Sequence, residues 1–388
     1  MKVAIVSDTY IPQKNGVVVF LNDFLPRLSE KAEVVVLAPN ETSEFKKNQI
    51  GNITEYLSPS LPFPLYEGYR MATMHRWQIK KIFEDEEVDV VHLHAPVLLG
   101  LKALDVAKSS GLPIVITYHT HFPDYVSHLS KGIIKGRMEE FAKIPVKRLI
   151  KTVFSKADIV TVPTIALKRE LEDYGLKRVE WVPNGIDFSK FERKTAKVDV
   201  RERYRIPKNA FLILYVGRIS FEKKIDVLLS AYKKISAEYE NAYLLIAGSG
   251  PYLEDYKKIA KAMKLKKAIF AGFVPDEELA NYYKSADVFA SASDSETFGL
   301  TFVEAMYFGL PVVGVNKLGA SDVITKECGL LAEAGNATDF ARCLSFLIDH
   351  EETKKKLAMG ARKKSREYDI KNITEKYYKI YKKIIYKK

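Results

Sequence analysis

The sequence has little cysteine, little tryptophan and no long apolar run. Its 388 residues include two cysteines and two tryptophans. Cys328 and Cys343 match no metal-ligand spacing and are too few for a disulfide framework, which favours a reducing compartment. No apolar run approaches the roughly 20 residues that a membrane-spanning helix needs. The first residues, MKVAIVSDTY, lead into a predicted strand without the layout of a signal peptide. We expect a cytoplasmic protein, either soluble or peripheral on the inner face of the cell membrane.

Metal-binding motifs are also missing. No Asp-x-Asp pair occurs in the chain. His119 and His121 stand at a predicted strand end, but no third ligand of suitable spacing accompanies them. The sequence therefore predicts no metal site and no cofactor. Glutamine occurs three times, while Lys, Glu, Ile and Tyr are plentiful, a composition that favours a thermophilic source.

Positive charge is in excess, and most of the excess lies at one end. The net charge is +12, and residues 351–388 contain 14 Lys or Arg against 5 Asp or Glu. A solvated amphipathic helix explains this distribution, and attraction to anionic lipid or nucleic acid is the alternative. We do not expect nucleic-acid binding, because no aromatic–basic recognition motif accompanies the charge.

Strand-like and helix-like segments alternate along the chain, which predicts an α/β protein. The alternation pauses around 182–200 and then restarts, so we expect two Rossmann-like, doubly wound parallel-sheet domains at 1–185 and 198–365. Residues 366–388 would form a last helix that crosses back to the first domain. Two such domains facing each other leave a cleft at the carboxyl ends of both sheets, where ligands bind. The predicted strands are Val3–Val6, Val34–Leu37, Val88–His92, Ile114–Thr117, Phe211–Val216, Ala242–Ala247, Ala268–Phe270, Val288–Ala290 and Pro311–Val315, and the predicted helices include Val18–Glu30, Leu99–Ser110, Thr301–Phe308 and Ile370–Ile385.

Glycine and basic residues follow the first strand of each half. Gly16 precedes a predicted helix, where a glycine lets a phosphate approach backbone N–H groups, although an ordinary turn explains it equally. Arg218 and Lys223 follow the strand ending at Val216. A guanidinium and an ammonium at a strand end can hold both phosphates of a nucleoside diphosphate and stabilise the leaving group. Alone, such basic residues are more often surface groups.

The segment SDSETFGLTFVEAM contains two glutamates eight residues apart, Glu296 and Glu304. Between them, the N–H groups of Phe298, Gly299 and Leu300 would open a helix and point at an anion or a sugar oxygen. A carboxylate can accept bonds from two hydroxyls, so Glu304 suits a ribose and Glu296 a hexose. Matching of the glutamates to the helix dipole is the alternative.

Four histidines lie near two predicted strand ends. His119 in ITYHTHFPDY is a candidate for contact with a reacting group, although a histidine in such a place more often packs or forms hydrogen bonds. We interpret His92 and His94 in VVHLHAP as structural.

Together, the Glu296–Glu304 segment, the GRISFEK segment and PNGID resemble glycosyltransferase family 4, of the GT-B fold, over nearly the whole chain. The resemblance implies a retaining, metal-independent hexosyltransferase that uses a UDP- or GDP-linked sugar. Arg218 and Lys223 would hold the donor diphosphate with Gly16 closing over it. Backbone near Val274 would contact the base, and His119 would lie beside the transferred sugar. Val17 stands where the family often has a second glycine.

The segments PSLPFPLYEGYR and YHTHFPDYVSHL resemble the lipid-glycosylating branch of that family: diacylglycerol glucosyltransferases, sulfoquinovosyl lipid synthases and related mannosyltransferases. Tyr10, Arg70 and Tyr125 are the expected acceptor-side residues. A soluble sugar or small-molecule acceptor, sugar-nucleotide epimerisation and a non-catalytic nucleic-acid-binding role are the alternatives. The oligomeric state cannot be predicted from the sequence.

Residues 131–156 combine eight basic residues with two acidic ones and interleaved apolar residues. Pro145 predicts two short helices rather than one. After it, Val146, Leu149, Ile150 and Val153 form an apolar stripe beside Lys147, Arg148 and Lys151. Packing on the protein's own sheet and insertion into an anionic membrane surface both fit this pattern.

Overall fold

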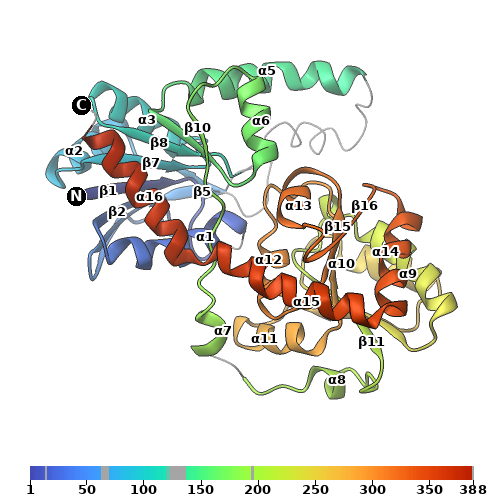
Figure 1. Ribbon diagram of the computed structural model, residues 1–388. Coiled ribbons are helices and arrows are strands. Elements are labelled where there is room, and N and C mark those ends of the chain that lie inside the picture. The colour runs from blue at the N-terminus through green and yellow to red at the C-terminus, as the bar shows by residue number, and fades with distance from the viewer. Residues whose placement is uncertain (14, 63–69, 120, 122–136, 194–195, 387–388) are drawn as a thin grey trace. The chain divides into compact units, whose positions relative to one another are not determined.

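The computed structural model describes residues 1–13, 15–62, 70–119, 121, 137–193 and 196–386. The chain forms two compact units: unit 1 is Met1–Asp187 with Ile370–Lys388, and unit 2 is Phe188–Asp369. The last helix of the chain is thus part of the first unit (Figure 1).

Unit 1 is built on an eight-stranded sheet of order β10-β9-β8-β7-β1-β2-β4-β3. All neighbouring strands are parallel except the edge pair β3–β4. A separate antiparallel pair, β5–β6, lies outside this sheet. The strands are β1 Lys2–Ser7, β2 Glu33–Pro39, β3 Lys46–Ile50, β4 Ile53–Ser58, β5 Ser60–Pro62, β6 Arg70–Ala72, β7 Val90–His94, β8 Ile114–Thr117, β9 Ile159–Val162 and β10 Val179–Trp181.

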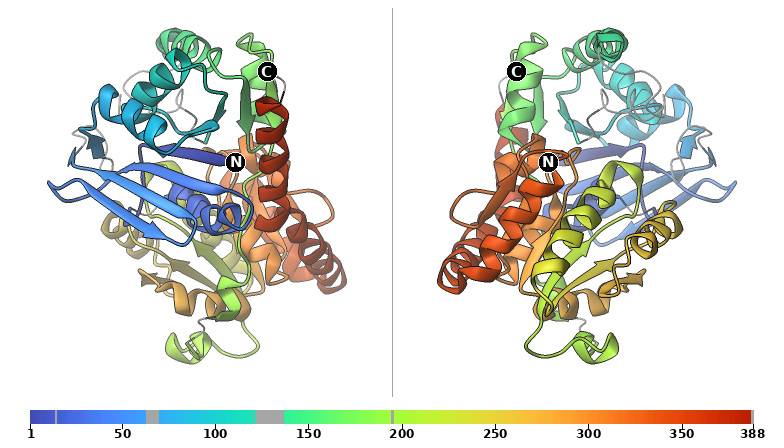
Figure 2. Two further views of the ribbon diagram at one scale, coloured as in Figure 1. Left: turned by 90° about the vertical axis from the view of Figure 1, so that its left-hand side faces the viewer. Right: turned by 90° about the vertical axis from the view of Figure 1, so that its right-hand side faces the viewer.

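Helices cover both faces of this sheet (Figure 2). One core joins the sheet to α2, α3, α5 and α6, and the other joins it to α1 and α16. The strands carry apolar side chains on both faces, as parallel strands between two helical layers require. The helices are α1 Gly16–Ser29, α2 Arg76–Asp85, α3 Leu99–Ser109, α5 Arg137–Phe154, α6 Ile165–Asp173 and α16 Ile370–Ile385.

Unit 2 has a six-stranded, fully parallel sheet of order β13-β12-β11-β14-β15-β16. Its strands are β11 Phe211–Val216, β12 Ala242–Ala247, β13 Ala268–Gly272, β14 Val288–Ala290, β15 Val312–Val315 and β16 Gly329–Ala332. Its helices are α7 Lys190–Arg193, α8 Val200–Arg203, α9 Ile225–Glu238, α10 Leu253–Ala262, α11 Asp276–Ser285, α12 Leu300–Tyr307, α13 Leu318–Val323, α14 Ala337–Asp349 and α15 Glu351–Ser365, with short 3-10 turns η1 Phe221–Lys223 and η2 Arg366–Tyr368.

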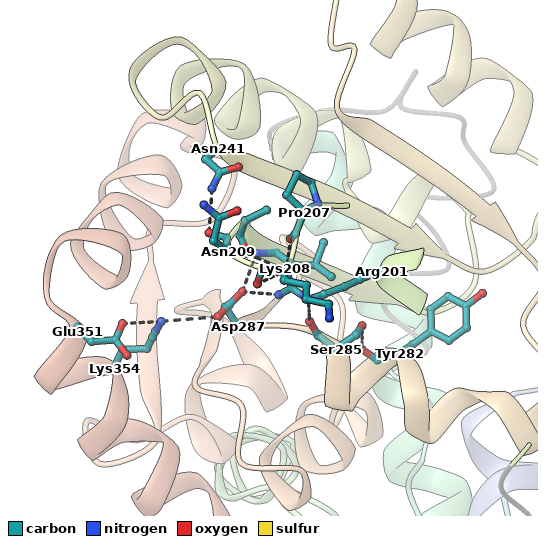
Figure 3. Close-up of polar contacts among 12 residues, drawn as sticks. Arg201, Pro207, Lys208, Asn209, Asn241, Tyr282, Ser285, Asp287, Glu351 and Lys354 are labelled. Atoms are coloured by element: carbon teal, nitrogen blue, oxygen red, sulfur yellow. Dashed lines mark hydrogen bonds and ion pairs between the residues drawn. The ribbon is translucent and has the colours of Figure 1, made fainter. Parts of the chain in front are cut away.

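A polar brace holds the amino-terminal edge of this sheet (Figure 3). The Arg201 guanidinium on α8 donates to the carbonyls of Pro207, Ala210 and Ser285, each at 2.9 Å, and to the Asp287 carboxylate at 3.0 Å. Asp287 also accepts the backbone N–H of Leu212 at 2.8 Å. The brace therefore joins α8 and the segments entering β11 and β14.

The predicted α/β class is correct, and the predicted strands at Ile114–Thr117, Phe211–Val216, Ala242–Ala247 and Val288–Ala290 coincide with β8, β11, β12 and β14. Several strands were not predicted, including β4, β9, β10 and β16. The prediction of two helices around Pro145 was wrong, because α5 runs through this proline. Loss of one backbone N–H bond is tolerated within a helix that is held by its packing, and Ile150 and Phe154 of α5 are buried in the core of unit 1.

Candidate functional site

In unit 2, the chain leaves β11 and β12 through glycines that let two backbone segments touch. A Cβ on Gly248 would lie 1.8 Å from the Gly217 carbonyl oxygen, and one on Gly250 would lie 2.2 Å from that of Ile219. No side chain fits at either place. Tyr215, fully buried in β11, donates its hydroxyl to the Arg218 carbonyl at 3.0 Å. This close packing fixes the backbone conformation at Arg218, whose side chain is half-buried.

Lys223 and Glu296, 73 residues apart in the sequence, form an ion pair beyond the carboxyl ends of the unit 2 strands. The Lys223 Nζ lies 2.6 Å from the Glu296 Oε1, and the two side chains are 22% and 18% exposed. Lys223 ends the 3-10 turn η1, and Glu296 lies in the loop between β14 and α12. The structure thus joins two residues for which the sequence predicted separate contacts, with the diphosphate and with the hexose.

The loop after Glu296 turns into α12 at Gly299, whose φ of 91° favours glycine. Phe298 anchors the turn: it is 2% exposed and packs edge-on against Tyr368, with ring centroids 5.3 Å apart. The Glu296 carbonyl accepts the Gly319 N–H at 2.7 Å. Helix α12 begins at Leu300, one residue before the predicted start, so its first-turn N–H groups follow directly after Gly299, and that of Phe302 donates to the Gly299 carbonyl at 3.0 Å.

Glu304 lies inside α12 and is 6% exposed. Its Oε2 accepts the Tyr283 hydroxyl at 2.8 Å, and its Oε1 lies 3.5 Å from the Lys190 Nζ. Burial and the adjacent Glu304 carboxylate raise the pKa of Tyr283 well above its usual range, so this hydroxyl remains a donor. Neither Tyr283 nor Lys190 was predicted, because both are distant in sequence and neither belongs to a recognisable motif.

Val274 follows the carboxyl end of β13, a third strand of the unit 2 sheet. It is 8% exposed and lies between the exposed Phe273 and Pro275, the N-cap residue of α11. The Gly272 carbonyl before it accepts the Gly248 N–H at 2.8 Å. Arg218, Lys223, Val274, Glu296 and the Phe298–Leu300 turn therefore all follow the carboxyl ends of strands in one sheet, where open α/β folds bind ligands.

In unit 1, Gly16 is exposed and is the first residue of α1. Asn15 caps this helix, because its side-chain oxygen accepts the N–H groups of Val17 and Val18 at 3.0 and 3.1 Å. The Asn15 amide in turn donates to the Thr9 hydroxyl at 2.7 Å. Two of the N–H groups that an anion could use are thus already satisfied by the protein.

His119 follows β8 and is 6% exposed. Its Nε2 lies 2.8 Å from the Nδ1 of His94, at the end of the adjacent strand β7. Burial lowers the pKa of His119 to about 3, so its imidazole is neutral at physiological pH. His121, by contrast, pairs with Glu170 at 2.9 Å. From the sequence, we predicted a contact with a reacting group for His119 and a structural role for His94. The sequence could not indicate that the two rings are hydrogen-bonded to each other.

The three predicted acceptor-side residues lie in different environments. Tyr10 is 4% exposed, and its hydroxyl donates to Glu55 at 2.7 Å. Arg70 donates to the hydroxyl and the carbonyl of Ser60 at 2.8 and 2.9 Å, across the β5–β6 pair. Tyr125 lies outside the described residues.

The apolar stripe on α5 is largely used within unit 1. Ile150 is buried, and Val146 and Val153 pack against the same core. Leu149 remains 60% exposed, and Ile144 40%. Among the described residues, no helix is long and apolar enough to cross a membrane. Across the same part of the chain, no three His, Cys, Asp or Glu side chains gather as metal ligands would.

Comparisons with known proteins agree with this architecture. The family described as "Glycosyltransferase Family 4" matches residues 14–190, and "Glycosyl transferases group 1" matches residues 197–364. The alpha-monoglucosyldiacylglycerol synthase of Streptococcus pneumoniae is 31% identical over 320 residues, which cover 81% of this chain and 70% of that protein. The sulfoquinovosyl transferase SQD2 of Arabidopsis thaliana is 30% identical over 82% of this chain and 61% of its own length.

Among solved structures, sucrose-phosphate synthase from Thermosynechococcus elongatus matches over 100% of both chains with a TM-score of 0.78 at 18% identity. The fold is therefore that of the GT-B glycosyltransferases. Within this class, the chain belongs to glycosyltransferase family 4, in the branch that contains lipid-glycosylating enzymes.

Proposed function

We propose that this glycosyltransferase moves a hexose from a UDP- or GDP-linked donor to an acceptor hydroxyl with retention of anomeric configuration. The observation that carries the proposal is the Lys223–Glu296 ion pair, which follows the carboxyl ends of strands in the unit 2 sheet, as Arg218 does. Two cations can bind the donor diphosphate, and a partly buried carboxylate can accept bonds from hexose hydroxyls. The Phe298–Leu300 turn adds N–H donors from the start of α12.

In the proposed reaction, the acceptor oxygen bonds to the anomeric carbon as the bond from that carbon to the phosphate oxygen breaks. Attack comes from the face that the diphosphate leaves, so the configuration is retained, and the leaving phosphate oxygen takes the acceptor proton. Arg218 and Lys223 would stabilise the charge that develops on the diphosphate, without a metal ion. Glu304 would accept bonds from the ribose hydroxyls, and backbone near Val274 would contact the base.

We further propose that the acceptor is a glycerolipid at an anionic membrane surface. Support comes from the names of two relatives, a glucosyldiacylglycerol synthase and a sulfoquinovosyl transferase. Helix α5 presents exposed Arg148 and Lys151 beside exposed Leu149, a combination suited to anionic headgroups. Because the stripe is mostly packed on unit 1, attachment would depend on charge more than on insertion.

A panel of UDP- and GDP-linked hexoses tests the donor. The correct donor at about 100 times its Kd should stabilise the protein by about 2.7 kcal/mol, which thermal unfolding detects. Transfer to diacylglycerol or to soluble sugars should then yield a product whose anomeric configuration, read by NMR, matches that of the donor. An inverted product would exclude the proposed chemistry, and conversion of the donor without any acceptor would indicate an epimerase.

A further inference from the structure

Buried polar side chains cluster at the carboxyl ends of β7 and β8 in unit 1. His92 and His94 belong to β7, and His119 follows β8. All three are buried, with exposed fractions of 0%, 0% and 6%. A hydrogen bond of 2.8 Å joins the Nδ1 of His94, predicted to be structural, to the Nε2 of His119, predicted to contact a reacting group.

One proton must lie in this bond, and it can belong to either ring. If His119 donates from Nε2, then neutral His94 carries its own proton on Nε2. If His94 donates from Nδ1, its Nε2 is a bare lone pair and the proton of His119 lies on Nδ1. The His94 Nε2 is buried and has no hydrogen-bond partner among the described residues. A buried N–H without an acceptor is the rarer and costlier outcome, which favours donation by His94.

Among the described residues, the groups around the His94 ring offer its Nε2 no partner. The His92 ring, with its centroid 4.0 Å away, already uses both nitrogens, Nδ1 with the Tyr381 hydroxyl and Nε2 with the Thr117 hydroxyl, each at 2.6 Å. Phe20 and Phe24 lie near His94, with centroids 5.9 and 6.4 Å from its ring. A doubly protonated ring is also disfavoured, because burial lowers the pKa values of all three histidines.

We propose that His94 is a positioning residue that holds His119 in the Nδ1–H tautomer. His119 then offers its ligand a hydrogen-bond donor and has no basic nitrogen with which to remove a proton. The ligand atom opposite must be an acceptor, such as a hydroxyl oxygen of a sugar. This inference rests on the proposed function only for the identity of the ligand, and it requires the acceptor proton to leave by another route.

The tautomers can be read directly in the full-length protein labelled with 15N in its histidines. The nitrogen that carries hydrogen is identified by its 15N shift and its one-bond coupling, and His94→Asn and His119→Asn spectra assign the two rings. We expect hydrogen on Nδ1 of both rings, at pH 6 and pH 8 alike. Hydrogen on the Nε2 of His119 would overturn the proposal. This measurement needs no activity, so it remains decisive even if no donor is ever turned over.

Kinetics test whether the bond matters for transfer. His94→Asn places an amide N–H near the Nδ1 position and should keep kcat within about threefold. His94→Leu removes the donor and should lower kcat about tenfold, the cost of one hydrogen bond, with the donor KM little changed. Equal activity of the two variants and wild type would overturn the positioning role. If His94→Leu fails to fold, the proposal is tested by the tautomer of the wild-type protein and by the kcat of His94→Asn. A fall in the kcat of His94→Asn well beyond threefold would count against the proposal.

Discussion

At the scale of single residues, the most informative feature is the charge pairing at the unit 2 strand ends. Lys223 and Glu296 neutralise each other at 2.6 Å while both remain about one-fifth exposed, so a ligand can still reach them. A sugar diphosphate would supply each residue with a second partner: a phosphate for Lys223 and a sugar hydroxyl for Glu296. Their contributions to transfer should therefore depend on one another.

Arg218→Ala and Lys223→Ala should each lower kcat about 100-fold or more, because each removes a charge that stabilises the leaving diphosphate. Combining Lys223→Ala with Glu296→Gln should cost less than the product of the two single effects. Lys257→Ala, which removes an exposed pair with Glu254, is the matched control and should be near neutral. Steady-state kinetics with and without EDTA measure these effects. Near-normal kcat in both Arg218→Ala and Lys223→Ala, or strict dependence of transfer on a divalent ion, would contradict the proposed roles of these two residues.

The buried histidines predict how stability depends on pH. Burial lowers the pKa values of His92, His94 and His119 in the folded state, to about 3 for His119. Below about pH 6.5, the unfolded chain binds protons that the folded chain does not, so stability falls as pH falls. From pH 7.5 to 5.5, each histidine should lower the free energy of unfolding by roughly 1 kcal/mol.

Urea denaturation at the two pH values checks this slope, with tryptophan fluorescence as the signal. Both tryptophans of the chain, Trp77 and Trp181, lie in unit 1 with the histidines. His92→Gln should reduce the slope, whereas His75→Gln, at an exposed position, should leave it unchanged. Equal stability of wild type at pH 7.5 and 5.5 would show that the three rings are not held neutral.

At the scale of elements, the brace around Arg201 is a structural feature separate from the candidate site. Arg201 is 18% exposed and Asp287 27%, and the brace lies at the end of the sheet opposite to Arg218 and Lys223. Lys354 of α15 adds a contact to Asp287 at 3.7 Å. The short helix α8 and the entries to β11 and β14 thus share one guanidinium as a hydrogen-bond donor.

Arg201→Ala should lower the free energy of unfolding of unit 2 by about 2–4 kcal/mol, because the half-buried Asp287 carboxylate loses its guanidinium partner and three carbonyls lose the donor that Arg201 supplies. Arg342→Ala is the control, since its pair with Asp339 is 77% exposed on the arginine side. It should change stability by less than about 0.5 kcal/mol. Far-UV circular dichroism follows both units while tryptophan fluorescence follows unit 1 alone. A loss seen equally by fluorescence would contradict a brace local to unit 2.

At the scale of the whole molecule, charge is unevenly distributed, and α5 has a basic exposed face. Arg148 and Lys151 are exposed on this helix and Lys147 is half-buried, whereas the apolar residues Ile150 and Phe154 face the unit 1 core. The membrane association that we propose would therefore depend on electrostatic attraction more than on deep insertion of the helix. Each basic residue near an anionic surface contributes about 1 kcal/mol.

We expect salt-sensitive binding to anionic liposomes and weak binding to neutral ones. Replacing Lys147, Arg148 and Lys151 by Glu should lower the partition coefficient at least 100-fold, because three attractions of about 1 kcal/mol become repulsions. Transfer to lipid should fall with it, while donor binding stays normal. Replacing Lys257, Lys258 and Lys261 of α10 in unit 2 by Glu makes the same change of charge and is the matched control. If wild type does not sediment with anionic liposomes at low salt, a soluble acceptor becomes the better interpretation.

Much of the fold follows from local sequence patterns. The run IVIT is short and β-branched and FLILYV is short and apolar, and they became β8 and β11 at the predicted bounds. The α16 pattern also matched its predicted range, Ile370–Ile385. The edge strand β3 and its neighbour β4 were not predicted, because KKNQI and ITEYLS contain polar residues and lack a continuous apolar run, although β4 is buried and parallel to β2. Their pairing depends on neighbours rather than on their own composition.

The sequence by itself determined the family, the alternation of strands and helices, and the individual candidate residues, because motif spacing and hydrophobic period are local properties of the chain. Only the tertiary structure decided which of these residues meet. It joined Lys223 to Glu296, Tyr283 to Glu304 and His94 to His119, and it packed Ile150 inward on α5. These contacts connect positions 21 to 73 residues apart. They depend on the order of strands in a sheet, which no short segment of sequence encodes.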